Sequence, residues 1–198
     1  TAGGHSMDIW NGAEITILER IQEIFSCAFL DSVMPYITRF ADSGIGWIVL
    51  ALLLLIPRKT RRTGAAMGVA LLLGFLTGNL LLKNCIARTR PFLWDPTISL
   101  LIEKPSEYSF PSGHTLASFE CAVAIFRYHR KWGIAALVCA VLIAFSRLYL
   151  QVHYPTDVLG GAMLGTLWGM LACWIVDTVI KRYQMKKNGQ KNCPTNVQ

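Results

Sequence analysis

The chain has 198 residues, of which 53% are hydrophobic and only 16% are charged, with a formal net charge of +7. Soluble domains usually carry about 25% charged residues, so this composition argues against a soluble globular protein. The positive charge lies in short clusters directly after apolar runs, at residues 58–62, 127–131 and 181–187, a placement typical of membrane-helix ends rather than of a nucleic-acid-binding surface.

The first forty residues contain a short segment before Met7 and a helical segment that could either lie on the membrane or cross it. Residues 1–6 precede Met7 and look like the remnant of an expression tag, so they are set aside. Over residues 17–30, apolar side chains recur at helical spacing beside charged ones. This pattern fits either an amphipathic helix on the membrane surface or the first helix of a six-helix bundle. We take six helices as the expectation.

Five further segments are expected to cross a bilayer, at about residues 42–57, 64–83, 113–128, 132–148 and 157–180. At about 1.5 Å per residue, the uncharged run 64–82 reaches roughly 28 Å, close to the bilayer core of about 30 Å. We therefore predict an all-α, polytopic transmembrane bundle. It forms a single membrane-embedded domain over residues 7–182, with a flexible cytoplasmic tail at 183–198.

Glycines at four-residue spacing predict close helix packing within this bundle. Small residues let helix backbones approach one another in lipid. The glycines concerned are Gly64, Gly68, Gly74, Gly78, Gly161, Gly165 and Gly169.

The six cysteines show no paired spacing, and three of them fall within apolar runs. This argues against a disulfide framework. No spacing of Cys and His residues indicates a zinc site, so we expect no metal cofactor.

Three polar stretches interrupt the apolar pattern: "KNCIARTRP" (83–91), "PSGH" (111–114) and "SRLYLQVHYPTD" (146–157). Alternation of the expected spans places all three on one side of the membrane and the basic clusters on the other. Basic clusters mark the cytoplasmic side, so we expect a cell-membrane protein whose polar side faces outward.

The residues of these stretches suit an anion. Lys83, Arg90 and Arg147 bring three cations to the membrane edge, and phosphate matches both the fork of Arg and the point charge of Lys. Ser112 and Gly113 stand where a helix begins, so free backbone N–H groups face the same place. We predict that these five residues bind a phosphate group.

Two histidines and an acid complete the pattern. His114 and His153 can titrate near neutral pH, and Asp157 lies four residues after His153 at the expected start of the last helix. An acid that holds one imidazole nitrogen leaves the other free to attack, as in other nucleophile–base pairs. The three are the candidate catalytic residues.

These motifs resemble the three-part signature of the type-2 phosphatidic acid phosphatase family. Six residues separate Lys83 from Arg90-Pro91, "PSGH" follows at 111–114, and Ser146-Arg147 precedes His153 and Asp157 at the family spacing. The resemblance covers residues 83–157 in motif and most of the chain in helix layout. It implies the helical core that these phosphatases share with vanadium haloperoxidases.

The resemblance also implies roles. His153 would attack phosphorus to give a phosphohistidine, Asp157 would orient it, and His114 would protonate the leaving oxygen and then activate water. No metal or other cofactor is implied. Arg88 falls inside the first motif without being a signature position, so we leave it as a residue that could support the site from behind.

The substrate implied is a phosphorylated lipid within the membrane, with undecaprenyl diphosphate preferred and phosphatidylglycerophosphate or phosphatidate as alternatives. The loop 92–110 either shapes access from the membrane interface or is an ordinary amphipathic loop. Haloperoxidase chemistry, a non-catalytic binding protein and a transporter remain rivals. A transporter would place charges inside the spans, where we find only Asp177. The sequence leaves the oligomeric state open.

Overall fold

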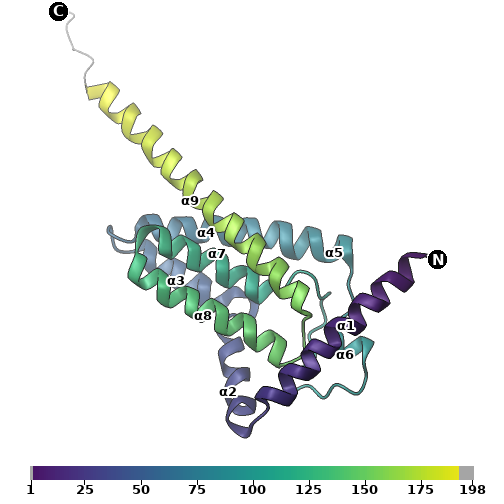
Figure 1. Ribbon diagram of the computed structural model, residues 1–198. Coiled ribbons are helices and arrows are strands. Elements are labelled where there is room, and N and C mark those ends of the chain that lie inside the picture. The colour runs from purple at the N-terminus through teal and green to yellow at the C-terminus, as the bar shows by residue number, and fades with distance from the viewer. Residues whose placement is uncertain (1, 192–198) are drawn as a thin grey trace, which may run out of the picture.

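The structure, a computed structural model, describes the backbone of residues 2–191 and the side chains of residues 11–42 and 44–188. Every regular element in this range is helical, which confirms the all-α prediction (Figure 1). The helices are α1 (Ala2–Phe25), α2 (Ala28–Arg39), α3 (Ile45–Leu55), α4 (Arg61–Gly74), α5 (Lys83–Ile86), α6 (Pro91–Trp94), α7 (Gly113–Tyr128), α8 (Arg130–Tyr149) and α9 (Pro155–Lys191). A 3-10 turn, η1 (Asp42–Gly44), precedes α3, and a π-helical segment, η2 (Phe75–Leu82), joins α4 to α5.

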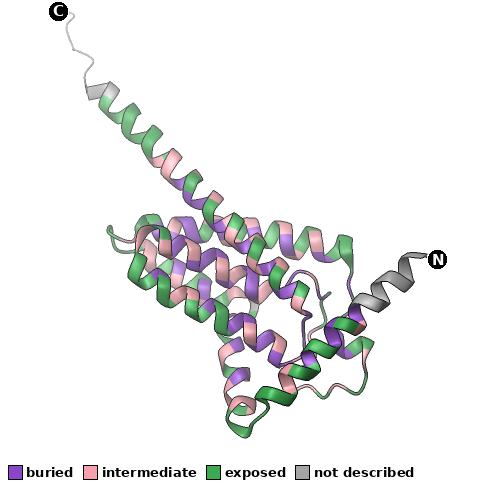
Figure 2. Ribbon diagram, in the orientation of Figure 1, coloured by how far each residue is buried: buried purple, intermediate pink, exposed green. Residues whose placement is uncertain are grey.

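Three helical stretches are long and apolar enough to cross a membrane: Arg61–Trp94, Arg130–Tyr149 and Pro155–Asn188. They contain the expected spans 64–83, 132–148 and 157–180. The expected span 42–57 overlaps the shorter apolar helix α3. Exposed residues lie along the outer faces of the bundle (Figure 2), and the large apolar ones among them include Leu52, Val138, Val141, Leu167 and Trp174. The chain is a membrane protein.

Helix α7 lies at the centre of the bundle, packed against α4, α8 and α9. At 16 residues it is shorter than α8, with 20 residues, and α9, with 37. Neighbouring helices rather than lipid surround it, so it tolerates polar side chains that a lipid-facing helix would not. The core beside it is built from Ala66, Met67, Cys121, Ala124, Ile143 and Cys173.

The glycine prediction is confirmed most clearly where α9 crosses α7. A Cβ at Gly161 would lie 2.7 Å from the carbonyl oxygen of Ser112, just before α7. A Cβ at Gly165 or Gly169 would lie 2.5 or 2.7 Å from a backbone oxygen of α7, so only glycine permits this approach. Gly68 is the exception. A Cβ there would meet nothing within 4 Å, so the prediction of close packing is wrong for Gly68.

Residues 9–40 form two helices instead of the single extra helix expected, with a break between Phe25 and Ala28. Helix α1 lies across one end of the bundle, where Gln22 donates a hydrogen bond to the carbonyl of Tyr149 at the end of α8. The ring of Phe25 packs edge-on against Phe145 of α8, with ring centroids 5.4 Å apart, and Ile24 is exposed. The six-helix count therefore needs revision in this region.

The two expected terminal segments are only partly covered by the structure. Residue 1 of the expected tag remnant lies outside the described residues, and the backbone from Ala2 belongs to α1. Helix α9 continues through the expected start of the tail to Lys191. Residues 192–198, including Cys193, lie outside the described residues.

Candidate active site

Backbone and side-chain hydrogen bonds join the three polar stretches at one end of the bundle. The Ser112 N–H donates to the carbonyl of Asp157 at 3.0 Å, which links the second stretch to the third. Arg90 Nη1 donates to the carbonyl of Val152 at 2.9 Å, which links the first to the third. Stretches far apart in sequence therefore form one site.

His153 and Asp157 are placed by the turn that begins α9. Pro155 stands at the start of the helix, and the Asp157 carboxylate accepts the Tyr154 N–H at 2.9 Å, as an acid near a helix N-terminus does. This arrangement leaves Asp157 Oδ2 3.6 Å from Nδ1 of His153. Both side chains are almost completely buried.

The neighbours of His153 determine which ring nitrogen is free. Arg90 Nη1 lies 3.2 Å from Nε2, and because an arginine can only donate, Nε2 must be the nitrogen with the lone pair. Nδ1 then carries the proton and faces the Asp157 carboxylate. Burial lowers the pKa of His153 to about 3, opposed by the hydrogen bond to Asp157 and assisted by Arg90 and Arg147. The ring is neutral at physiological pH and its Nε2 is available as a nucleophile.

The three predicted cations are buried around the same place. Arg147 donates from Nη1 to Thr38 of α2 at 2.6 Å, while its Nε has no hydrogen-bond partner among the described residues. Arg90 Nε donates to the Glu107 carbonyl at 2.6 Å. Lys83 pairs with the Glu107 carboxylate. A buried arginine N–H without a partner requires an acceptor, and an anion would supply one.

The "PSGH" stretch begins α7 in the predicted way. Ser112 is the residue before the helix, and its hydroxyl accepts a hydrogen bond from Thr115 at 3.0 Å instead of capping the helix. A Cβ at Gly113 would lie 3.1 Å from Asn79 and 3.7 Å from the Lys83 ammonium, so glycine keeps this approach open. His114 Nε2 lies 2.8 Å from Asp42 in η1.

A single cavity of about 1000 Å³ connects most of these residues. Of the predicted site residues, its lining includes Lys83, Arg90, Gly113, His114, Arg147 and His153. Ser112 and Asp157 lie buried behind this wall. The loop segment 101–107 forms another wall, so this part of the expected loop 92–110 does border the site.

Several residues that support the site were missed in the sequence. Ser109 donates to Asp157 Oδ2 at 2.5 Å and lies 3.4 Å from His153 Nδ1, beside the pair it supports. Arg88, left as a supporting residue, contacts Asp157 from the other side. Asp42 and Glu107 contact His114 and Lys83. No local pattern distinguishes Asp42, Glu107 and Ser109 from ordinary loop residues, whereas Arg88 lies within the first motif.

Glu120 was also overlooked, although a charge inside an expected span is a recognised sign of function. It lies within α7, is 1% exposed, lines the cavity and has no partner for Oε2 among the described residues. The statement that only Asp177 places charge inside a span is therefore wrong. Asp177 itself accepts a hydrogen bond from Tyr128 at 3.1 Å.

Comparison with known proteins gives consistent matches. The PAP2 superfamily profile matches residues 62–181. The chain is 34% identical over 152 residues to an undecaprenyl-diphosphatase of Sulfolobus acidocaldarius, covering 76% of this chain and 73% of that protein. It is 30% identical over 173 residues to the undecaprenyl-diphosphatase BcrC of Bacillus subtilis, covering 84% and 89%.

A solved structure agrees with these sequence matches. The crystal structure of a transmembrane PAP2-type phosphatidylglycerolphosphate phosphatase from Bacillus subtilis superposes with a TM-score of 0.66 at 29% sequence identity. The match covers 90% of this chain and 89% of that one.

The pairing of Glu107 with Lys83 generates a first prediction. The Lys83 ammonium, through a hydrogen bond, holds the pKa of Glu107 below its usual range, so the carboxylate is charged at neutral pH and competes with any other anion for Lys83. In Glu107→Gln, inorganic phosphate should bind about threefold more tightly, because the ion pair between buried Lys83 and exposed Glu107 no longer has to be broken. Isothermal titration in detergent measures this affinity.

Glu103→Gln is the matched control, because Glu103 lines the same cavity on the same loop and has no ion pair among the described residues. Its phosphate affinity should equal that of the parent chain. Unchanged or weaker binding in Glu107→Gln would show that Glu107 does not compete for the anion.

Proposed function

The chain belongs to the PAP2 superfamily, and on this premise we propose that it is a lipid phosphatase that converts undecaprenyl diphosphate to undecaprenyl phosphate. The observation that carries the proposal is the cavity shared by two histidines and three buried cations. Sequence similarity over 84% of the chain to an undecaprenyl-diphosphatase favours this substrate. Phosphatidylglycerophosphate is the second candidate, since a protein named for that activity has a similar structure over 90% of the chain.

The first step is the transfer of the terminal phosphoryl group to His153. Nε2 attacks phosphorus and forms an N–P bond, while the P–O bond to the lipid phosphate breaks. Asp157 faces Nδ1 at 3.6 Å and stabilises the positive charge that develops on the ring. His114 donates a proton to the leaving oxygen, and Asp42 at 2.8 Å holds this imidazole in place.

The second step restores the enzyme. His114, now neutral, takes a proton from a water molecule as the water oxygen attacks phosphorus. The N–P bond breaks, inorganic phosphate leaves, and the electron pair returns to His153 Nε2. The same histidine thus acts as acid and then as base.

The residues predicted to bind the phosphate group, here called the cradle, supply electrostatic stabilisation in both steps. Lys83, Arg90 and Arg147 surround the phosphoryl oxygens, and the N–H of Gly113 adds a donor at the start of α7. The N–H of Ser112, which the sequence predicts to be free, is instead bonded to the carbonyl of Asp157. Negative charge spreads over these oxygens in the transition state, and fixed donors in a site shielded from water stabilise it strongly.

We place the site on the extracytoplasmic side of a multi-pass cell-membrane protein. The basic residues of the α3–α4 turn, the α7–α8 turn and the end of α9 lie at the end of the bundle away from the site (Figure 1). Such clusters mark the cytoplasmic side. A lipid phosphate at the level of the outer headgroups would then reach the cavity while its tail stays in the bilayer.

The substrate assignment is tested by a comparison of rates. Purified protein in detergent should release phosphate from undecaprenyl diphosphate faster than from phosphatidylglycerophosphate or phosphatidate. Excess EDTA should not change these rates, because the protein's own cations provide the charge stabilisation. Activity that is lost in EDTA and restored by a metal would contradict this mechanism, and a faster rate with phosphatidylglycerophosphate would favour the second candidate.

The roles of the histidines are tested by two substitutions. His153→Ala should lower turnover by at least about a thousandfold and form no phosphoprotein, because the attacking nitrogen is gone. His114→Ala should still accumulate some acid-labile phosphoprotein from a reactive diphosphate substrate, because its main loss is in proton transfer. Radiolabelled substrate followed by rapid denaturation measures both. Full activity in His153→Ala would end the nucleophile assignment.

The orientation is tested with single cysteines in a background without the native ones. Thr97 and Lys59 are both exposed, at the site end and the opposite end respectively. A membrane-impermeant maleimide should label Thr97→Cys in intact spheroplasts and label Lys59→Cys only after lysis. The reverse result would place the site in the cytoplasm.

A further inference from the structure

We infer that Arg88 and Glu14 are positioning residues for the nucleophile, so that α1 supplies part of the active site. Together they fix the carboxylate of Asp157 against His153. This inference rests on the proposed function, in which His153 attacks phosphorus. It adds to that function a connection between the chemistry and a helix that lies outside the signature motifs.

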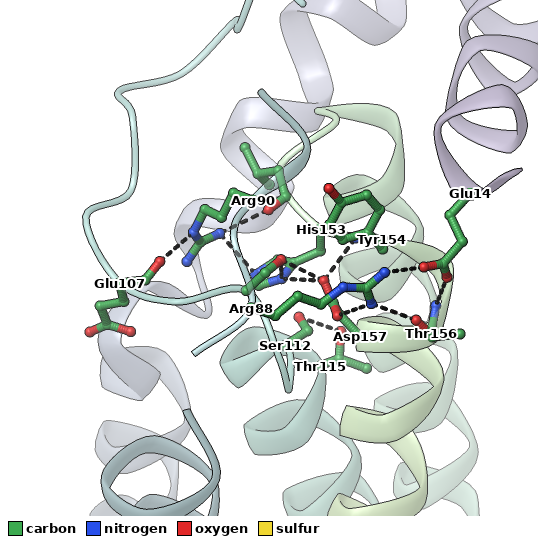
Figure 3. A network of polar contacts seen from close by, with 12 residues as sticks. Glu14, Arg88, Arg90, Glu107, Ser112, Thr115, His153, Tyr154, Thr156 and Asp157 are labelled. Atoms are coloured by element: carbon green, nitrogen blue, oxygen red, sulfur yellow. Dashed lines mark hydrogen bonds and ion pairs between the residues drawn. The ribbon is translucent and has the colours of Figure 1, made fainter. Parts of the chain in front are cut away.

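Arg88 contacts the oxygen of Asp157 that does not face His153. Its Nη1 donates to Asp157 Oδ1 at 2.7 Å, while Oδ2 is the oxygen near His153 (Figure 3). Nη1 also donates to the hydroxyl of Thr156 at 2.7 Å. The guanidinium carbon lies 3.9 Å above the ring of Tyr154, the residue that follows His153. Arg88 therefore fixes both the carboxylate and the turn that carries the histidine.

Glu14 holds Arg88 from the opposite side. Its Oε2 pairs with Nη2 of Arg88, and its Oε1 accepts the N–H of Thr156 at 2.8 Å. Asn11, one turn earlier on α1, accepts from Nη2 of Arg88 at 2.8 Å. Helix α1 thus binds both the arginine and the first turn of α9.

Burial makes this arrangement sensitive to each member. Glu14 and Arg88 are 5% and 8% exposed, and Asp157 is fully buried. Burying charges costs much free energy unless each is paired, and removal of one partner leaves the others uncompensated. One arginine shared by two carboxylates cannot neutralise both, so each carboxylate depends on keeping its contact with Arg88. A change at Glu14 is therefore transmitted to Asp157 through Arg88.

A purely structural role would not require contact with Asp157. For comparison, Arg20 on α1 pairs with Glu23 at the surface, at 2.7 Å, and has no contact with the site. Arg88 instead contacts the acid that holds the histidine, so its loss should act on the rate of the chemical step and leave phosphate binding intact. The ratio of these two effects distinguishes positioning from general stability.

The experiment compares Arg88→Lys, Arg88→Gln, Glu14→Gln and the control Glu19→Gln, which lies exposed on α1. We expect kcat to fall on the order of a hundredfold in Arg88→Gln and about tenfold in Arg88→Lys and Glu14→Gln, comparable with the loss of outer partners of metal-bound histidines. KM and the inhibition constant of inorganic phosphate should stay within about twofold, because Lys83, Arg90 and Arg147 are untouched. Glu19→Gln should match the parent chain.

The outcomes separate the inference from the function on which it rests. A parent chain without phosphatase activity overturns the proposed function. An active parent chain with normal kcat in Glu14→Gln overturns the role of α1, and normal kcat in folded Arg88→Gln overturns the whole inference. Equal losses in kcat and in phosphate affinity would show a structural role only. If Arg88→Gln does not purify as a monodisperse protein, Arg88→Lys and Glu14→Gln decide the question, because both retain hydrogen-bonding groups at the same positions.

Discussion

Asp157 is fully buried, and its two carboxylate oxygens accept hydrogen bonds from three parts of the chain. Arg88 reaches it from the first polar stretch, Ser109 from the loop before α7, and the Tyr154 N–H from the turn before α9. An ionised carboxylate is stable in such a place only when donors replace the water it has lost. The packing of these segments therefore depends on one charge, and so does the orientation of His153 beside it.

Positive charge, rather than negative charge, is concentrated on the wall of the cavity that carries Arg90 and Arg147. Arg90 and Arg147 lower the pKa of His153 together with burial, and Arg147 keeps an N–H without a partner among the described residues. The site thus holds a fixed excess of positive potential next to a neutral imidazole. This combination favours an incoming anion and a nucleophile at the same time, which separate exposed residues in water would not achieve. The membrane-embedded bundle provides the low dielectric that makes the excess effective.

The sequence predicts those features that depend on local composition and spacing. The run 64–83 is apolar over the length of a bilayer, and the motif residues from Lys83 to Asp157 keep their spacing, so the helical bundle and the members of the cavity could be inferred. Contacts between distant segments could not. Glu14 is one of several acids on an amphipathic helix, and helical periodicity does not tell which of them is buried. The break after Phe25 contains neither glycine nor proline, so no residue there signals the end of a helix. Glu120 lies inside the expected span 113–128, which is inferred from the length of the segment, so its charge was missed.

Discrimination between lipids must come from parts of the cavity other than the phosphoryl cradle. In the proposed mechanism the cradle residues contact only the phosphoryl group, which every candidate substrate carries. A lipid tail gains little by moving from the bilayer to an apolar wall such as Ile48, Leu71 and Phe75, because lipid and leucine side chains are equally apolar. The hydrophobic effect therefore cannot separate one tail from another here. Shape and polar contacts remain, and Glu120 provides a buried carboxylate oxygen without a partner among the described residues on this same wall. A substrate that offers a hydrogen-bond donor below its phosphate would gain from that oxygen, whereas a bare hydrocarbon chain would leave it unsatisfied.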